Sequence, residues 1–301
     1  MTSHQLVQER RAAVIPAADK QTLLRESLNR FDTNPSGYYD AEKDRQDIET
    51  YYEGIDFVNS DGKTLYQSLK KLLETTHHNR LNYERDSDRL LKAVVDLHPD
   101  KTFRSLYSGK EADPVKIIEE EMHLIVEAGA DSLTGHYLNI EHVVPQSWFS
   151  DRHDPDSKKE PMRGDLHHLY YCEKPCNEFR GNKAYTDFSS FQPETLRTEQ
   201  IRGECGMGED DRFEPEYGKG FVARATLYFL LRYPERIETQ FRNQIDIELL
   251  LRWHAEFPPN TLYEKHRNQS IFTIQGNRNP LIDFPEHVQR IDFKQFLNIR
   301  S

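Results

Sequence analysis

The sequence predicts an α+β fold in which a mainly helical body surrounds a loop-rich centre. Apolar residues recur at helical spacing on both sides of the middle of the chain, within residues 62–97 and 220–257. Residues 131–190 between them lack a helix-length period and are rich in His, Asn, Gly and aromatic side chains. With 301 residues and an aromatic fraction of 11%, the chain is long enough to form one large core.

Residues 1–35 are predicted to form an N-terminal extension outside the main domain. They contain a helix around Lys20–Phe31, which ends at the Pro/Gly-containing segment DTNPSG. The extension is either a regulatory or partner-binding arm or a packing extension. The charged residues of Ala41–Ile55 are predicted to form the next helix.

Two apolar helices and one ambiguous segment follow. The turn at residues 59–62 precedes a helix whose stripe of Leu65, Leu69, Leu72 and Leu73 we assign to the core. A second helix is expected over 87–97, and the inward positions there are Leu90, Leu91, Val94 and Val95. Residues 115–125 fit a helix or a strand equally well.

The centre and the C-terminal part differ in character. Residues 131–190 predict loops, two short strands and one short helix. Residues 220–233, GFVARATLYFLLRY, predict a buried central helix, and Arg224 and Arg232 interrupt its apolar run. No segment approaches the roughly 18 apolar residues of a membrane span. A further helix is expected over 237–257 and a loop over 275–287.

The formal net charge of −11 counts against nucleic-acid binding through the electrostatics of the whole protein. A local basic groove or a bound cation can still attract phosphate to an acidic protein. Arg10 and Arg11 are not followed by the apolar segment of roughly 7–15 residues that a secretion signal contains. The chain as written predicts a cytoplasmic protein, although a mature secreted form would have the same sequence.

Cys172, Cys176 and Cys205 are too few to build a disulfide framework. Cys172 and Cys176 are four residues apart, so on a helix they would share one face as small buried residues. A structural zinc ion would need two more ligands, and no second cysteine pair lies nearby. We therefore expect no disulfide framework.

Side chains that can carry chemistry concentrate in residues 139–185. NIEHVVPQSWF (139–149) places Glu141 beside His142. Neighbours on a strand point to opposite faces, so the pair serves one site only if the backbone turns there. Asn177 and Arg180 follow Pro175, which suits the first turn of a helix, and their spacing puts them on one face.

Phosphodiester hydrolysis uses residues of these types. A neutral His can activate water near pH 7. Mg²⁺ takes one or two oxygen ligands from a protein, such as a Glu carboxylate and an Asn carbonyl. An Arg can hold phosphate with its planar fork of donors. Polar clusters also form as satisfied networks inside cores, so composition alone leaves both interpretations open.

Four linked motifs make the sequence resemble a known family. They are the segment LYSG (106–109); N-x-E-H-V-V-P-Q-S-W-F with D-L-H-H-L-Y and N-x-x-R-G-N-x-x-Y; FEPEYGKGFVARATLYFLLRYP (213–234); and RNQSIFTIQGNRNPLIDFPE (267–286). In this order, across about residues 50–290, they resemble the bacterial endonuclease I family of His-Me finger (ββα-metal) nucleases. The resemblance implies a nuclease domain over residues 36–301, with a ββα-metal finger at about 136–190 embedded in the helical body.

The resemblance also implies residue roles. His142 would be the general base, and Glu141 and Asn177 would be the metal ligands. The expected cation is Mg²⁺, with Mn²⁺ or Ca²⁺ as substitutes. Attack on phosphorus with the 3′ oxygen leaving would give 5′-phosphate ends.

Three catalytic assignments keep alternatives. Arg180 either contacts phosphate or braces the finger by bonding backbone carbonyls. Arg152 and Arg163 both lie in the loop between the two expected strands, where some family members carry a transition-state arginine. His167 either orients a catalytic group or is a buried strand histidine.

Several other polar residues are expected to have mainly structural roles. Asp165 and His168 share the alternatives of His167, with the structural role favoured. Gln275, Asn277 and Asn279 are expected to hold the late loop against the finger.

The sequence therefore predicts a metal-dependent, largely sequence-nonspecific endonuclease acting on DNA, RNA or both, without a membrane partner. Its contacts would be mainly to phosphate and sugar, which carry no sequence information. The alternative is a catalytically inactive or partner-activated nucleic-acid-binding protein of the same fold. Loss of His, Glu or Asn would mark an inactive site, and all three are present. A nuclease retained in its own cell would need an inhibitor or an activating partner.

Overall fold

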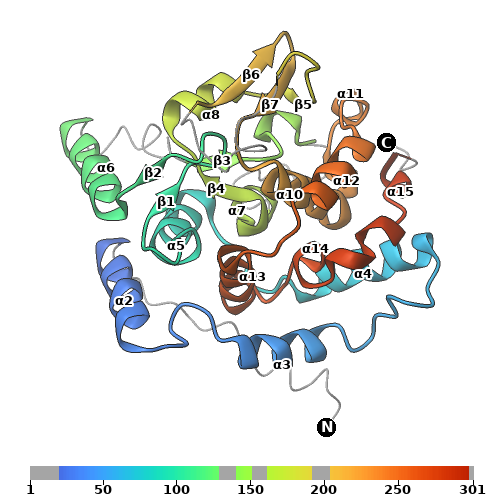
Figure 1. The fold of residues 1–301 in the computed structure, drawn as a ribbon, viewed down its shortest axis with the longest axis horizontal. Helices are drawn as coiled ribbons and strands as arrows, with labels where there is room; N and C mark the ends of the chain where they lie inside the picture. Colours follow the sequence, from blue (N-terminus) through green and yellow to red (C-terminus); the bar gives the residue numbers. More distant parts are fainter. Residues whose placement is uncertain (1–19, 129–139, 151–160, 192–203, 298–301) are drawn as a thin grey trace.

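The computed structural model describes residues 20–128, 140–150, 161–191 and 204–297, and Figure 1 shows helices arranged around three small sheets. The helices, with 3-10 and π helices labelled η, are α2 (Lys20–Thr33), α3 (Ala41–Tyr51), α4 (Gly62–Thr76), η1 (Tyr83–Ser87), α5 (Asp88–Leu90), η2 (Leu91–Val95), α6 (Pro114–Ala128), η4 (Gln146–Trp148), α7 (Pro161–Gly164), η7 (Leu166–His168), α8 (Lys174–Arg180), α10 (Lys219–Arg232), η8 (Pro234–Arg236), α11 (Thr239–Arg242), α12 (Ile247–Glu256), α13 (Leu262–Gln275), α14 (Pro280–Asp283), η9 (Pro285–Arg290) and α15 (Lys294–Leu297). The strands are β1 (Phe103–Arg104), β2 (Glu111–Ala112), β3 (Ile140–His142), β4 (Leu169–Tyr171), β5 (Ala184–Tyr185), β6 (Gly206–Glu209) and β7 (Arg212–Pro215). This composition agrees with the predicted α+β, mainly helical fold. Among the described helices, none has the length and apolar character needed to cross a membrane.

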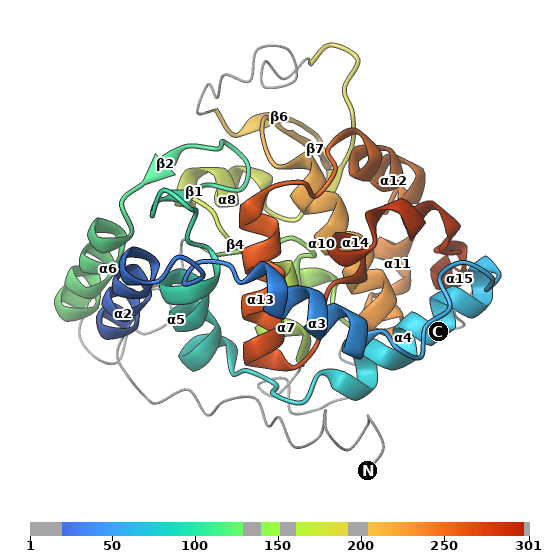
Figure 2. The same ribbon diagram turned by 60° about the horizontal axis from the view of Figure 1, so that its bottom comes forward.

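The predicted central helix is α10, which lies in the middle of the helical body (Figures 1 and 2). All of its residues except Phe221 are buried. Gly218, which precedes it, has a φ of 76°, and a Cβ there would come within 2.2 Å of the Leu106 carbonyl oxygen. Only glycine tolerates both constraints. Because α10 packs against α12, α4 and η7, it supports the segment that leads into β4.

The helix expected after residues 59–62 is α4. The Asp61 carboxylate caps it by accepting hydrogen bonds from the backbone N–H groups of Lys63 and Thr64, both at 3.0 Å. Its leucine stripe is buried as predicted, except that Leu72 is only partly covered. The ambiguous segment at 115–125 is helical and belongs to α6.

The described part of the N-terminal extension packs onto the body. The predicted helix is α2, and its Leu23 and Leu24 are buried in an apolar cluster with residues of η2 and α6. Lys20 pairs with Asp88 and Glu121. Figure 2 shows α2 and α3 crossing the same side of the molecule, where the backbone of Asp40, which caps α3, is hydrogen-bonded to a side chain of α13.

The central segment follows the order strand, strand, helix. β3 and β4 are antiparallel, with Glu141 opposite Tyr170 and His142 opposite Leu169. α8 follows β4 and carries Pro175 in its first turn, as predicted. β1 pairs with β2, and β5 and β6 flank β7 in a three-stranded sheet. The bond between Asn177 and the Ile140 carbonyl holds α8 alongside β3.

Several predicted elements differ in extent or type. The single helix expected over 237–257 is divided into α11 and α12, because Asp246 caps a new helix by accepting a hydrogen bond from Leu249 N at 2.9 Å. The loop expected over 275–287 contains α14, which Asn279 caps, and the start of η9. The helix expected over 87–97 is a short α-helical turn between two π-helical segments.

Cys176 and Cys205 form a single disulfide, which corrects the expectation that Cys176 is a small buried residue on one helix with Cys172. Cys172 lies between β4 and α8 rather than on one helix with Cys176, and it is buried and unpaired. The disulfide joins the first turn of α8 to the residue before β6. It therefore ties the helix beside β3 to the three-stranded sheet.

Candidate active site

Glu141 and His142 form the end of β3, where the chain bends before η4. The Glu141 carboxylate contacts Tyr107 and Arg180, whereas the His142 ring packs against Tyr83, with ring centres 4.7 Å apart. These separate surroundings follow from the alternation of side chains along a strand. The strand end thus presents a carboxylate on one side and an imidazole on the other.

Arg180 braces this strand end from α8. Its Nη1 donates to Glu141 Oε1 at 2.5 Å and to the His142 carbonyl at 3.1 Å, and its Nη2 donates to the Val143 carbonyl at 2.8 Å. The side chain is 1% exposed. Of the two alternatives left open by the sequence, these contacts favour the bracing role over contact with phosphate.

Glu141 retains one carboxylate oxygen for a ligand. Its Oε1 also accepts a hydrogen bond from the Tyr107 hydroxyl at 2.6 Å, whereas Oε2 has no hydrogen-bond partner among the described residues. Burial raises the pKa of the Glu141 carboxyl, and the charge of Arg180 and the hydroxyl of Tyr107 oppose that rise. The ion pair therefore favours the ionised carboxylate in a buried position.

Asn177 offers a second oxygen beside β3. Its Nδ2 donates to the Ile140 carbonyl at 2.9 Å, which leaves Oδ1 without a hydrogen-bond partner within the described part of the chain. No group of three or more His, Cys, Asp or Glu side chains suited to a metal ion occurs in the described ranges. A hard cation such as Mg²⁺ requires less, because it takes one or two protein oxygens and keeps several waters.

The hydrogen bonds around His142 fix which ring nitrogen carries the proton. Arg163 Nε donates to Gln146 Oε1 at 2.9 Å. An arginine has only donors, so the amide oxygen of Gln146 must face Arg163 and its NH₂ group must face His142 Nδ1, 3.3 Å away. Nδ1 is therefore the acceptor, and Nε2–H donates to the Arg163 carbonyl at 3.0 Å.

The surroundings of His142 also keep it neutral. Burial lowers its pKa well below the ordinary value of 6.5, and the neighbouring His168 and the charge of Arg163 act in the same direction. A neutral imidazole with its lone pair on Nδ1 can accept a proton near pH 7. His142 is thus a neutral imidazole whose Nδ1 is an acceptor.

His167 lies apart from these groups. Its Nε2 is 3.2 Å from the Asn277 carbonyl and its ring packs against Tyr228, with ring centres 4.5 Å apart. The histidine that contacts the His142 ring is His168, with ring centres 5.4 Å apart. Both belong to the 3-10 helix η7 rather than to the strand expected there, because Asp165 accepts a hydrogen bond from His167 N.

Gln275 and Asn277 hold the late loop against this segment, whereas Asn279 bonds to Asn268 and to the Arg224 carbonyl instead. Gln275 accepts a hydrogen bond from Leu166 N at 2.7 Å and donates to the Asp165 carboxylate at 3.0 Å. Asn277 Nδ2 donates to the Tyr228 hydroxyl, which itself donates to Asp165. These bonds connect α13, η7 and α10 through one buried carboxylate.

Two residues of the candidate site were not identified from the sequence. Tyr107 lies 34 residues before its partner Glu141. Gln146 lies within one of the linked motifs, but the sequence assigned it no function. Arg163, one of two candidate arginines, has its backbone and its side chain within hydrogen-bond distance of the His142–Gln146 pair. The other candidate, Arg152, lies outside the described residues.

Comparison with known proteins gives a family match. Residues 61–286, about three quarters of the chain, match the family model described as Endonuclease I. The matched range contains every residue of the candidate site.

Individual relatives carry nuclease names. The chain is 30% identical to a periplasmic deoxyribonuclease of Aeromonas hydrophila over 48% of this chain and 63% of that protein. It is 26% identical to an extracellular ribonuclease of Bacillus subtilis (strain 168) over 81% of this chain and 79% of that protein. An extracellular ribonuclease of Bacillus amyloliquefaciens is likewise 26% identical, over 81% and 78%. With its family model matched over most of its length, the chain belongs to the endonuclease I family.

Proposed function

We propose that the protein is a metal-dependent, largely sequence-nonspecific endonuclease that hydrolyses phosphodiester bonds of DNA, RNA or both. The observation that carries the proposal is the state of His142, a buried neutral imidazole whose Nδ1 is an acceptor, at the same strand end as Glu141, whose Oε2 lacks a hydrogen-bond partner among the described residues. Relatives named as deoxyribonucleases and ribonucleases support both substrate classes.

In this proposal β3, β4 and α8 form the ββα-metal finger. The antiparallel pairing of the strands, the helix that follows, and the bond from Asn177 to Ile140 support that assignment. Arg180 stiffens the finger by joining α8 to the backbone that leaves β3. The disulfide at Cys176 fixes the other side of α8.

Glu141 Oε2 and Asn177 Oδ1 fit a hard divalent cation. Both are oxygens without hydrogen-bond partners among the described residues, and both belong to side chains whose remaining polar atoms are already bonded. This donor set suits Mg²⁺, with Mn²⁺ or Ca²⁺ as substitutes. When bound, the cation would neutralise charge on the phosphate and on the leaving oxygen.

The reaction assigned to the protein's own residues is a proton transfer at His142. Nδ1 takes a proton from the attacking water, and the Nε2–H bond to the Arg163 carbonyl holds the ring in place throughout. The water must replace the Gln146 amide at Nδ1, because both approach the same lone pair. Attack on phosphorus expels the 3′ oxygen and leaves a 5′-phosphate end.

Arg163 is the arginine proposed to contact the phosphate. Its side chain is half-buried beside the base, whereas the donors of Arg180 are directed to Glu141 and to backbone carbonyls. Movement of Arg163 toward phosphate would also release Gln146 from His142. Substrate binding and exposure of the base would then be coupled.

A digestion assay tests the proposal. Purified full-length protein is incubated with plasmid DNA and with structured RNA, in Mg²⁺ and in EDTA, beside the variants His142→Ala and Glu248→Gln. Glu248 is an exposed carboxylate on α12 and serves as the control. We expect cleavage that requires the cation, disappears in His142→Ala and persists in Glu248→Gln.

The product ends test the direction of cleavage. Fragments with 5′-phosphates accept label from polynucleotide kinase only after phosphatase treatment. Fragments that label without that treatment would contradict the proposed leaving group. Binding of nucleic acid without cleavage, in each of several divalent cations, would instead favour an inactive or partner-activated binding protein.

A further inference from the structure

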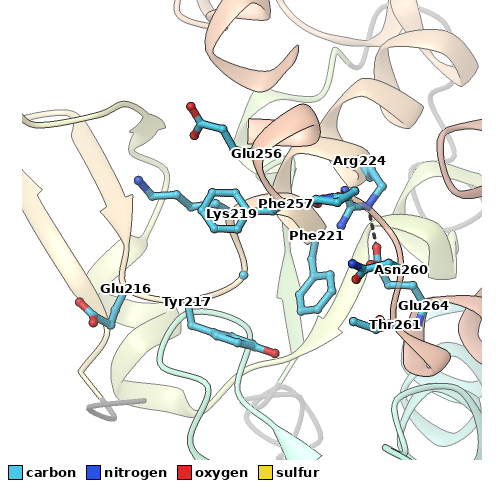
Figure 3. A pocket seen from close by; sticks show the side chains of 13 residues that line it. Glu216, Tyr217, Lys219, Phe221, Arg224, Glu256, Phe257, Asn260, Thr261 and Glu264 are labelled. Atoms are coloured by element: carbon cyan, nitrogen blue, oxygen red, sulfur yellow. Dashed lines mark hydrogen bonds and ion pairs between the residues drawn. The ribbon is translucent and has the colours of Figure 1, made fainter. Parts of the chain in front are cut away.

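A second concave site lies between the start of α10 and the connection from α12 to α13. It is a cavity of about 310 Å³, lined by residues 216–221 and Arg224 on one side and by residues 256–258, 260, 261 and 264 on the other (Figure 3). This volume lies at the lower end of the range for ligand pockets. None of the candidate catalytic residues lines it.

The walls of the cavity are aromatic. Tyr217, Phe221 and Phe257 are each half-buried, and Figure 3 shows their rings around one space. Half-buried rings leave apolar faces against which a flat ligand can stack. The walls therefore favour a planar ring system over an aliphatic chain.

The floor of the cavity carries a buried ion pair with an unpaired acceptor. Arg224 donates from Nε to Glu264 Oε1 at 2.6 Å and from Nη1 to the Phe257 carbonyl at 2.7 Å. Glu264 Oε2 is buried without a hydrogen-bond partner in the described structure. Because a buried carboxylate oxygen left unpaired is costly, this atom calls for an N–H or O–H donor.

A donor lies beside that acceptor. The position of a Cβ on Gly220 would be only 2.7 Å from Arg224 Nη2, so the guanidinium lies directly against the backbone that lines the cavity. Nη2 has no hydrogen bond among the described residues. The ion pair on the floor thus carries one acceptor, Glu264 Oε2, and one donor, Arg224 Nη2, that have no hydrogen-bond partner in the described structure.

This chemistry disfavours simple ions. An inorganic anion would meet the unpaired Glu264 oxygen, and a metal ion would meet the Arg224 guanidinium. Lys219 lines the cavity, but its ammonium group is paired with Glu214 and Asp187. A neutral planar ligand with a donor next to an acceptor can stack on the aromatic walls and form hydrogen bonds with Glu264 and Arg224 on the floor.

We propose that this cavity is a nucleobase-binding pocket, in which Phe221, Tyr217 and Phe257 stack on a base of the substrate strand and the Arg224–Glu264 pair reads its hydrogen-bonding edge. Every nucleobase presents adjacent donor and acceptor groups on a flat ring, and unpaired bases are recognised by such stacking and edge contacts. The choice of a nucleobase over other planar rings rests on the proposed nuclease function.

Contacts connect the pocket to the candidate active site. The rings of Phe221 and Tyr170 are stacked, with ring centres 6.2 Å apart. Tyr170 is the residue opposite Glu141 in the β3–β4 pair. Tyr217 N donates to the carbonyl of Tyr107, whose hydroxyl binds Glu141. One wall of the pocket is therefore one residue away from Glu141, so a strand could occupy both sites.

Nucleoside binding tests the pocket separately from catalysis, because a nucleoside lacks the phosphate that the catalytic site would bind. Saturation-transfer NMR titrations use the full chain with guanosine, adenosine, cytidine and uridine, and with ribose 5-phosphate as a probe that lacks a base. The variants are Glu264→Gln, Phe221→Leu and His142→Ala, with Glu248→Gln as the exposed control. Glu264→Gln can place an NH₂ group where the unpaired acceptor now lies.

We expect at least one nucleoside to bind the wild-type chain, and about tenfold weaker binding in both pocket variants. His142→Ala and Glu248→Gln should bind as the wild type does, and ribose 5-phosphate should not compete. Phe221→Leu supplies the test if Glu264→Gln fails to fold, as judged by circular dichroism. Absence of nucleoside binding, or undiminished binding in folded pocket variants, would overturn the inference.

The two proposals can fail independently. Digestion of plasmid or RNA without nucleoside binding would refute the pocket and leave the nuclease proposal intact. Nucleoside binding without digestion in any divalent cation would refute the nuclease proposal and leave the binding pocket intact.

Discussion

Replacing Arg180 by methionine tests whether this residue braces the end of β3 or contacts substrate. The substitution keeps an unbranched side chain but removes the donors to Glu141 Oε1 and to the carbonyls of His142 and Val143. It leaves a buried carboxylate that retains only the Tyr107 hydroxyl. Removing one partner of a buried ion pair costs about 3–5 kcal/mol, because the other charge is left uncompensated.

Thermal unfolding measures this loss. For a chain of 301 residues, about 3–5 kcal/mol corresponds to a fall of roughly 5–8 °C in Tm. Arg45→Met is the matched control, because Arg45 pairs with Glu42 and Glu49 on the exposed face of α3. Exposed pairs contribute little, so the control should unfold within about 1 °C of the wild type.

A double-mutant cycle isolates the ion pair itself. Arg180→Met combined with Glu141→Gln should lose less stability than the two single changes added together, by about 1 kcal/mol or more. An Arg180→Met protein that keeps the wild-type Tm while its KM rises would refute the bracing argument. That result would assign Arg180 to the substrate instead.

Three further predictions concern His142, the disulfide and three buried histidines. Gln146→Glu places a carboxylate beside His142 Nδ1, which favours the protonated ring and raises the pKa of His142. The acid limb of the pH dependence of kcat/KM should therefore move upward by about 1 to 3 pH units, and Gln146→Met should move it less. An unmoved acid limb in Gln146→Glu would contradict the contact between Gln146 and His142. Cys205→Ser removes a disulfide between residues 29 apart and should lower the free energy of unfolding, measured by urea titration, by about 3.5 kcal/mol. Adding reductant to the wild type should have a similar effect. A urea midpoint that neither change lowers would count against the disulfide. Burial lowers the pKa values of His77, His254 and His266 to about 4, so between pH 6.5 and 4 the unfolded chain binds more protons than the folded one. Stability should therefore fall as pH drops through this window, by up to about 3 kcal/mol per histidine, and a urea midpoint at pH 5.0 equal to that at pH 7.5 would refute this.

The sequence predicted best the elements whose signals are local. The leucine stripe after Asp61 specifies α4, and the long apolar run at 220–233 specifies α10, because spacing and capping act within a few turns. The break at Asp246 was missed because a capping aspartate inside an apolar period resembles any other polar position. The π-helical segments around residues 83–95 arise from tertiary packing and carry no comparable pattern.

The candidate site shows the same division. Glu141, His142, Asn177 and Arg180 were found because they lie within linked motifs, and the structure brings all four to β3 and α8. The contacts that specify their chemical state are less local. Tyr107 lies within the LYSG motif, but it reaches Glu141 from a distant segment, and the Cys176–Cys205 disulfide crosses 29 residues, so no local spacing indicates either contact.

The disulfide bears on the redox conditions under which the candidate site stays ordered. Disulfides persist in oxidising compartments and are rare in the reducing cytosol. Reduction would loosen α8, the helix that carries Asn177, a proposed metal ligand.

The positions of the two arginines near β3 also explain how an acidic protein could hold a phosphodiester. The guanidinium of Arg180 donates its hydrogen bonds to Glu141 and to backbone carbonyls. It therefore stabilises the local structure and does not present its charge to the substrate. In the proposed site, attraction comes instead from groups closer to the surface, namely Arg163 and the cation that Glu141 and Asn177 would hold. Charges within a few ångströms of the phosphate dominate over dispersed charge that is screened beyond about 8–10 Å. A net charge of −11 is therefore compatible with catalysis, and it predicts that binding energy is concentrated at the cleavage site rather than spread along the strand.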